Sequence, residues 1–89
     1  MSNTMSDKIK VGVLGAGTWG IALARMLSNA GKDVTVWSAV GAEIDSLEAT
    51  GIHPKFPNIQ LPKGIVYTKS IQKACDGMGI LVFAVPSPL

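Results

Sequence analysis

Three glycines at fixed spacing constrain this chain more than any other feature of its sequence. Gly15, Gly17 and Gly20 form the pattern G-x-G-x-x-G between an apolar run at 11–14 and a helix-like stretch at 21–27. We expect Gly15 to allow a sharp turn out of a strand, Gly17 to leave its backbone open to close approach, and Gly20 to let the helix pack tightly on the sheet. A Gly-rich connection that only turns the chain is the simpler alternative.

A strand, this turn and a helix in succession are typical of a site that binds the pyrophosphate of a dinucleotide. The first N–H groups of the helix have no partner within it, so they face the anion, and the helix dipole adds to the attraction. Trp19 has two open interpretations, as a core residue or as a residue beside the ligand. The predicted phosphate contacts are Gly15, Ala16, Gly17, Thr18, Trp19 and Gly20.

The rest of the chain predicts alternating strands and helices from apolar periodicity and from cap and turn signals. Pro54, Pro57 and Pro62 exclude a long helix or a central strand from 52–64, which we interpret as an extended loop. The last strand is apolar throughout, which predicts a central place in the sheet. The expected strands are 8–14, 33–37, 65–68 and 79–85, and the expected helices are 18–30, 42–50 and 71–75, the last capped by Ser70.

One apolar stripe is expected on the first helix. Its members recur at helical spacing and would face the sheet, with Met26 as core filler. They are Ala22, Leu23, Met26, Leu27 and Ala30.

Alternating elements predict an α/β fold of Rossmann type, a doubly wound parallel sheet represented by its N-terminal part, β-α-β-α-β-α-β. The spatial order of its strands would be third, second, first, fourth. The ligand crevice would then lie between the first and fourth strands, with the glycine turn and 85–87 on one rim. We expect 1–7 to be a disordered terminus and 8–89 to be the N-terminal portion of a dinucleotide-binding domain, truncated and without its catalytic domain.

Composition excludes several classes of function. The 89 residues carry a net charge of +2 without a dense basic cluster, which argues against a nucleic-acid partner. No signal peptide is recognised, and no apolar run reaches the roughly 18 residues that span a bilayer, so no membrane insertion is expected. The single cysteine, Cys75, forms no internal disulfide and fits a cytoplasmic protein.

Catalytic and metal-ligating candidates are few. His53 is the only histidine and lacks partners for a metal or acid–base site, and Cys75 fits packing better than nucleophilic chemistry. We therefore assign no catalytic residue and no metal site.

The end of the second strand bears on the choice of cofactor, because the residue there contacts the adenosine ribose in Rossmann domains. Ser38, Ala39 and Val40 supply neither an acid nor a base, and Glu43 is interpreted as a solvated charge inside a helix. Ser38 can donate a hydrogen bond to either form of the ribose. Without a cation the 2′-phosphate of NADP lacks compensation, so NAD is the expected cofactor and NADP the second candidate.

Four segments in order carry a resemblance to a known family. The segment 13–24 (VLGAGTWGIALA), Asp33–Trp37 (DVTVW), 56–62 (FPNIQLP) and 84–87 (AVPS) resemble NAD(P)-dependent glycerol-3-phosphate dehydrogenase, where a Ser/Thr and an aromatic residue fill the variable places of the fingerprint. They cover nearly the whole chain from 11 onward, and the double-proline segment is the most specific.

The chain also departs from the family's pattern. The basic residue often found after the second-strand Trp is absent, with Ala39 and Val40 in that region, which puts NADP use in doubt. Ile52 replaces a frequent Asn, and Asn58 replaces a Gly.

The resemblance implies interconversion of dihydroxyacetone phosphate, a small phosphorylated substrate, and sn-glycerol 3-phosphate, a precursor of phospholipids, by a homodimer in the full enzyme. The family's lysines that polarise the ketone and bind phosphate lie beyond this segment, so the 89 residues alone are expected to be inactive. Because the second half of the nucleotide-binding sheet is missing, the isolated segment is also expected to leave apolar edges uncovered and to be weakly stable. The resemblance places the 15–20 turn at the phosphates, with Thr18 and Trp19 beside them, and Ser38 and Ala39 beside the adenosine. Two alternatives stay open: another Rossmann dehydrogenase, such as a ketopantoate reductase or hydroxyacid dehydrogenase, and a non-catalytic nucleotide-sensing domain.

Overall fold

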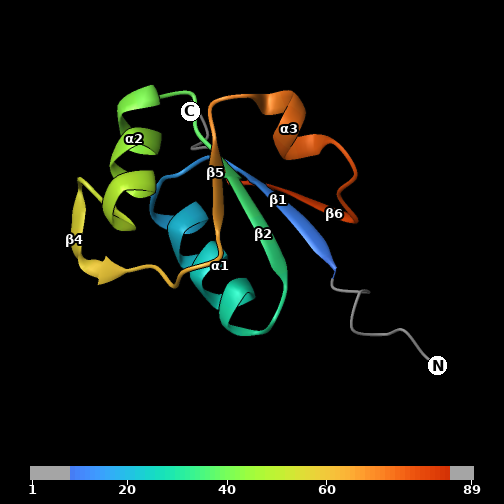
Figure 1. The fold of residues 1–89 in the computed structure, drawn as a ribbon, viewed down its shortest axis with the longest axis horizontal. Helices are drawn as coiled ribbons and strands as arrows, with labels where there is room; N and C mark the ends of the chain where they lie inside the picture. The colour runs from blue at the N-terminus through green and yellow to red at the C-terminus, as the bar shows by residue number, and fades with distance from the viewer. Residues whose placement is uncertain (1–8, 85–89) are drawn as a thin grey trace.

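A four-stranded parallel sheet forms the centre of the molecule. The structure is a computed structural model that describes residues 9–84. The strands are β1 (Lys10–Leu14), β2 (Asp33–Trp37), β5 (Val66–Thr68) and β6 (Ile80–Phe83), in the spatial order β5-β2-β1-β6. These are the third, second, first and fourth predicted strands, so the expected order and fold class are confirmed (Figure 1).

The register brings the carboxyl ends of the strands to one edge of the sheet. Leu14 of β1 lies opposite both Trp37 of β2 and Phe83 of β6, and Trp37 lies opposite Thr68 of β5. The indole Nε1 of Trp37 also donates a hydrogen bond to the carbonyl of Lys69, at 3.1 Å. Segments that follow β1 and β2 in the sequence therefore meet at this edge.

The helices are α1 (Thr18–Asn29), α2 (Gly41–Thr50) and α3 (Ile71–Cys75), close to the predicted bounds. Ser70 caps α3 as expected, its side chain accepting a hydrogen bond from the Lys73 N–H. Gly12 packs so closely on α3 that a Cβ there would collide with the Ala74 carbonyl oxygen. Because side chains alternate along a strand, α3 covers the face opposite to the core face of β1.

The core lies between the other face of the sheet, α1 and α2. Its buried side chains come from every layer of that side, from the two central strands, the helices and the chain before β5. They are Val11, Val13, Ala16, Ile21, Ala24, Val34, Val36, Leu47, Leu61 and Ile65.

The expected stripe on α1 is only partly right. Leu27 packs against the core, but the buried apolar residues of this helix are Ile21 and Ala24. Ala22 and Ala30 are exposed, and Met26, expected in the core, is 58% exposed. The helix carries more apolar residues than one stripe needs, so periodicity alone does not select the contact face.

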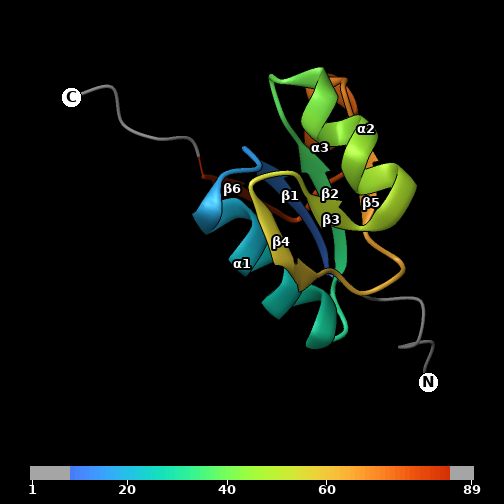
Figure 2. The ribbon, with the colours of Figure 1, turned by 90° about the vertical axis from the view of Figure 1, so that its left-hand side faces the viewer.

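The stretch 52–64, predicted as an extended loop, contains a β-hairpin. β3 (Ile52–His53) pairs antiparallel with β4 (Phe56–Gln60) as a separate two-stranded sheet. The hairpin lies beside α2 in both views (Figures 1 and 2), and its Phe56 and Ile59 pack against the core. Pro57 is tolerated in β4 because an edge strand can lack one donor of the ladder.

β6 is not central in the described part of the chain, contrary to prediction. It pairs with β1 alone and ends the sheet, and three of its side chains, Ile80, Leu81 and Phe83, are exposed. This fits the expectation that the segment leaves an apolar edge uncovered. Residues 85–87, expected on the ligand rim, lie outside the described residues. Between residues 9 and 84, no helix is both long and apolar enough for a membrane crossing.

Candidate functional site

The glycine turn leaves β1 with the geometry that its first glycine was predicted to permit. Gly15 has a φ of 121°, a region that side-chain-bearing residues rarely adopt. Its N–H donates to the Trp37 carbonyl at 2.7 Å. The turn is therefore attached directly to the end of β2.

Gly17 is the N-cap of α1 and borders open space. In the described part of the chain, a Cβ at this position would meet no atom within 4 Å other than those of its two neighbouring residues. Its backbone is extended (φ −77°, ψ −167°), and the first helical hydrogen bond runs from the Ile21 N–H to its carbonyl. Glycine has no side chain to cap the helix, and the first turn contains no acidic residue. The first N–H groups of α1 are thus available to an anion.

Gly20 makes room for the turn itself. A Cβ there would collide with the Gly15 carbonyl oxygen and would lie 3.4 Å from the Ala84 Cβ, just after β6. The Ala84 N–H in turn donates to the Leu14 carbonyl at 2.9 Å. The close approach predicted for Gly20 is therefore chiefly to the backbone of the turn and to the end of β6.

The two interpretations of Trp19 separate in the structure. Its side chain is 75% exposed, so it is not a core residue, while Ala16 in the same turn is buried. A place beside the ligand stays a prediction for Trp19, as it does for Thr18, whose backbone begins α1.

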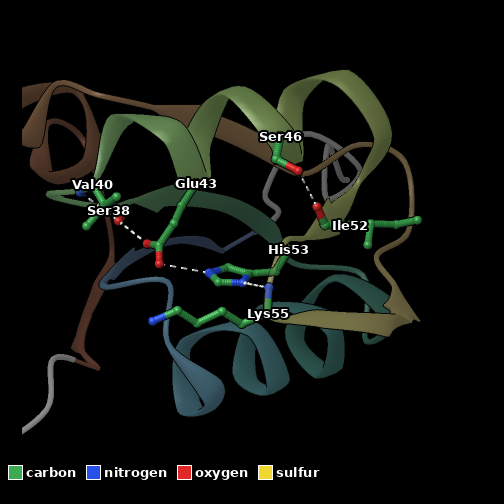
Figure 3. A network of polar contacts seen from close by, with 7 residues as sticks. All are labelled: Ser38, Val40, Glu43, Ser46, Ile52, His53 and Lys55. Atoms are coloured by element: carbon green, nitrogen blue, oxygen red, sulfur yellow. Dashed lines mark hydrogen bonds and ion pairs between the residues drawn. The ribbon is translucent and has the colours of Figure 1, made fainter.

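Ser38 follows β2 and is buried, and its hydroxyl is already engaged. It donates to Glu43 Oε1 at 2.6 Å and accepts from the Val40 N–H at 3.0 Å (Figure 3). The hydroxyl hydrogen predicted to reach the ribose therefore goes to Glu43. Ala39, the other residue predicted at the adenosine, is exposed.

Glu43 was interpreted as a solvated charge, and this is wrong. Its side chain is only 16% exposed, and its second oxygen, Oε2, lies 3.0 Å from His53 Nε2. That contact is close but lacks the alignment of a regular hydrogen bond. Glu43 stands in the first turn of α2, where a carboxylate complements the helix dipole.

His53 is 1% exposed and accounts for much of the burial around Glu43. Its Nδ1 accepts a hydrogen bond from the Lys55 N–H at 3.0 Å, and its ring packs on Phe56 with centroids 4.9 Å apart. Because Nδ1 acts as acceptor, the ring proton is assigned to Nε2, facing the carboxylate. Figure 3 shows the resulting chain of polar contacts from Ser38 through Glu43 to the hairpin.

This cluster was missed because His53 reaches Glu43 only through the hairpin, which was not predicted, and because no local pattern indicates that Ser38 turns toward Glu43. The one local signal was the acidic residue in the first turn of a predicted helix. In the described residues no group of three potential metal ligands occurs, and Cys75 is a half-buried free thiol.

A cavity of about 500 Å³ lies elsewhere, beyond the C-terminal half of α2 and against the start of β5. None of the residues of the glycine turn lines it. Tyr67 does, and burial raises the pKa of its hydroxyl to about 12. The glycine turn and the Ser38 cluster, which share the carboxyl edge of β1 and β2, therefore form the candidate site.

Comparisons with known proteins give matches along most of the chain. The model of the family described as "NAD-dependent glycerol-3-phosphate dehydrogenase N-terminus" matches residues 10–89. The NAD(P)+ glycerol-3-phosphate dehydrogenase 2 of Lactobacillus delbrueckii subsp. bulgaricus is 55% identical over 78 residues, which are 88% of this chain and 23% of that protein. The NAD(P)+ enzyme of that name from Agathobacter rectalis is 43% identical over 79 residues, 88% of this chain and 24% of its own length.

A crystal structure of glycerol-3-phosphate dehydrogenase from Coxiella burnetii has the same arrangement of elements. It superposes with a TM-score of 0.82 at 31% identity, over 90% of this chain and 25% of that one. The chain thus spans about a quarter of the length of the relatives it matches.

Proposed function

Since the chain belongs to the family of NAD-dependent glycerol-3-phosphate dehydrogenase N-terminal segments, we propose that it forms the dinucleotide-binding part of such an enzyme. The observation that carries the proposal is Gly17, an uncapped helix N-terminus with open space where a side chain would stand. A pyrophosphate can approach this backbone and accept hydrogen bonds from the first N–H groups of α1.

The residues divide into two contact regions. Residues 15–20 hold the pyrophosphate, with Thr18 and Trp19 beside it, and Ser38 and Ala39 lie along the adenosine. The 2.7 Å hydrogen bond between Gly15 and Trp37 supports this division, because it keeps the two regions side by side. The cofactor is NAD or NADP, whose nicotinamide supplies the hydride chemistry while this segment binds and orients it.

The wider activity follows from the relatives' names and is part of the proposal. The complete enzyme would interconvert dihydroxyacetone phosphate and sn-glycerol 3-phosphate for phospholipid synthesis, as a cytoplasmic homodimer. Residues 8–89 would be the first portion of its cofactor domain, with the catalytic lysines in the remainder. The terminus expected at 1–7 lies outside the described residues. The matched family and relatives favour this interpretation over a ketopantoate reductase, a hydroxyacid dehydrogenase or a nucleotide sensor.

Gly17→Ala tests the proposal most directly. Among residues 9–84, the added methyl group meets no atom within 4 Å beyond the two neighbouring residues, so the fold is retained, but it occupies the space that the phosphates need. Loss of one or two charge-assisted hydrogen bonds, about 1.5–3 kcal/mol, weakens NADH binding roughly ten- to hundredfold. The measurement is titration of the chain with NADH, followed by tryptophan fluorescence, with circular dichroism as a check on folding.

Gly79→Ala is the matched control, because it adds a methyl group in ordinary contact at the opposite edge of the sheet. A chimera in which this chain replaces the matching segment of the Lactobacillus delbrueckii relative provides a second measurement, of dihydroxyacetone phosphate reduction. Equal NADH affinity in Gly17→Ala and in the unaltered protein would refute the phosphate site. Failure of both the chain and the chimera to bind NADH would refute the proposed function.

A further inference from the structure

Outside the glycine turn, the charged group that bears most directly on a bound ligand is the carboxylate of Glu43. It belongs to α2 and lies beside the end of β2, where Ser38 contacts it. Ser38 Oγ holds one of its oxygens at 2.6 Å, and His53 Nε2 lies 3.0 Å from the other. Ser38 directly follows Trp37, whose carbonyl accepts the hydrogen bond from Gly15. Two hydrogen bonds, joined through the neighbouring residues Trp37 and Ser38, therefore connect this carboxylate to the edge that the glycine turn occupies.

We propose that Glu43 determines the choice between NAD and NADP. The proposal rests on the proposed function and extends it to the ribose. In Rossmann domains an acid at the end of the second strand suits a free 2′-hydroxyl, and this chain has none at positions 38–40. Glu43 supplies the negative charge from the first turn of α2, where the Ser38 hydroxyl keeps it at the strand end.

Within residues 9–84, no lysine or arginine forms an ion pair with Glu43. Lys69 pairs with Asp45 at 2.8 Å, and the side chain of Lys55 extends beside the Glu43–His53 contact without pairing with the carboxylate (Figure 3). His53, with Nδ1 acting as acceptor, contacts the carboxylate as a neutral ring. A 2′-phosphate brought to this edge would meet a carboxylate that has no ion pair with a lysine or arginine, in a partly buried setting where two negative charges repel each other more strongly than in bulk water.

Ser38 and His53 act as positioning residues in this arrangement. Ser38 uses its only hydrogen on Glu43, so the serine orients the carboxylate rather than donating to the ribose. His53 blocks the side of the carboxylate that faces the hairpin, since its ring is almost fully buried there. The oxygens of Glu43 are thereby held at the strand end instead of turning into solvent.

The test compares Glu43→Gln with Glu48→Gln. Each removes one negative charge from α2, but Glu48 is exposed and lies on a later turn of the helix. Dissociation constants for NADH and NADPH are measured by fluorescence titration of the chain and of the chimera described above. We expect Glu43→Gln to shift the ratio of the two constants toward NADPH by about tenfold, and Glu48→Gln to leave it unchanged.

Salt provides a second measurement that needs no variant. Dissolved salt screens the repulsion between the 2′-phosphate and Glu43. The ratio of the NADPH to the NADH dissociation constant of the unaltered protein should therefore fall as ionic strength rises, and Glu43→Gln should lack this dependence. If Glu43 only capped the helix, its replacement would lower the melting temperature and leave the ratio of the constants unchanged.

The outcomes separate this inference from the proposed function. Binding of both cofactors with an unchanged ratio in Glu43→Gln, or an NADH preference that does not respond to salt, would overturn the role of Glu43 alone. Binding of neither cofactor by the unaltered chain and chimera would overturn the proposed function, and this inference with it.

Discussion

At the scale of single residues, burial gives side chains properties that their type does not predict. Tyr67 has its hydroxyl out of contact with solvent and without a hydrogen-bond partner in the described part of the chain. Desolvation disfavours the phenolate and raises the pKa of Tyr67 to about 12. Glu43 and His53 are similar cases. Glu43 was interpreted as a solvated charge and His53 falls in the stretch expected to be a loop, and both lie in a shared, partly buried cluster.

Tyr67 is the only tyrosine of the chain, so its ionisation can be followed alone. An unfolded tyrosine ionises near pH 10, roughly two units lower. Its contribution to stability is therefore complete below about pH 10 and is lost as the pH rises toward 12. We expect phenolate absorbance to rise with a midpoint near 12 in the folded chain. Urea unfolding between pH 10 and 12 should show a smaller loss of stability in Tyr67→Phe than in the unaltered chain. An absorbance midpoint near pH 10 in the folded chain would contradict the assigned pKa of Tyr67.

At the scale of elements, the hairpin of β3 and β4 is tied to α2 more firmly than a loop would be. Ser46 donates to the Ile52 carbonyl at 2.8 Å, Gln60 Nε2 to the Thr50 carbonyl at 2.9 Å, and the Leu61 N–H to the Gly51 carbonyl at 3.0 Å. His53 adds its contact with Glu43. The hairpin thus supports the helix whose first turn presents Glu43 to the site.

His53→Ala tests this support. The variant removes a buried ring that packs on Phe56 and leaves a partly buried carboxylate with one partner fewer. We expect a loss of about 2–3 kcal/mol in the free energy of unfolding, measured by urea denaturation. Lys55→Ala is the control, since it keeps the backbone N–H that His53 accepts from and alters only an exposed side chain. Equal losses in the two variants would show that the ring does not support the hairpin.

At the scale of the whole molecule, one end of the sheet is apolar and open. β6 pairs on one side only among the described strands, and Phe83 is 72% exposed. Unpaired backbone groups beside exposed apolar side chains favour pairing between copies. The same edge is where further strands of a doubly wound sheet would add.

We expect the isolated chain to self-associate through this edge as its concentration rises. Phe83→Lys places a charge on the edge strand and should shift the population toward monomer in sedimentation velocity. Met26→Lys adds the same charge at a similarly exposed apolar position, but on α1, and should not. Association that is unaffected by Phe83→Lys would exclude β6 as the contact.

Most of the fold was predictable because its signals are local. Apolar runs, the glycines that end elements and the Ser70 cap lie within a few residues of the structures they specify. Alternation of strands and helices then indicates a parallel sheet, and the Rossmann-type glycine turn indicates its strand order. The face of α1 was not predictable, because its apolar residues surround more than one side. The hairpin was not predicted because Pro54 and Pro57 exclude a central strand. They do not exclude a two-stranded sheet, in which each strand is an edge strand.

The sequence by itself determined the glycine turn, since a positive φ at Gly15 and a bare backbone at Gly17 depend on which side chains are absent. Only the tertiary structure decided the surroundings of Glu43. A carboxylate is solvated or buried according to what packs on it, and here that is a serine from a strand end and a histidine from a hairpin. Contacts between segments separated along the chain depend on how the elements assemble, and no local pattern encodes that assembly.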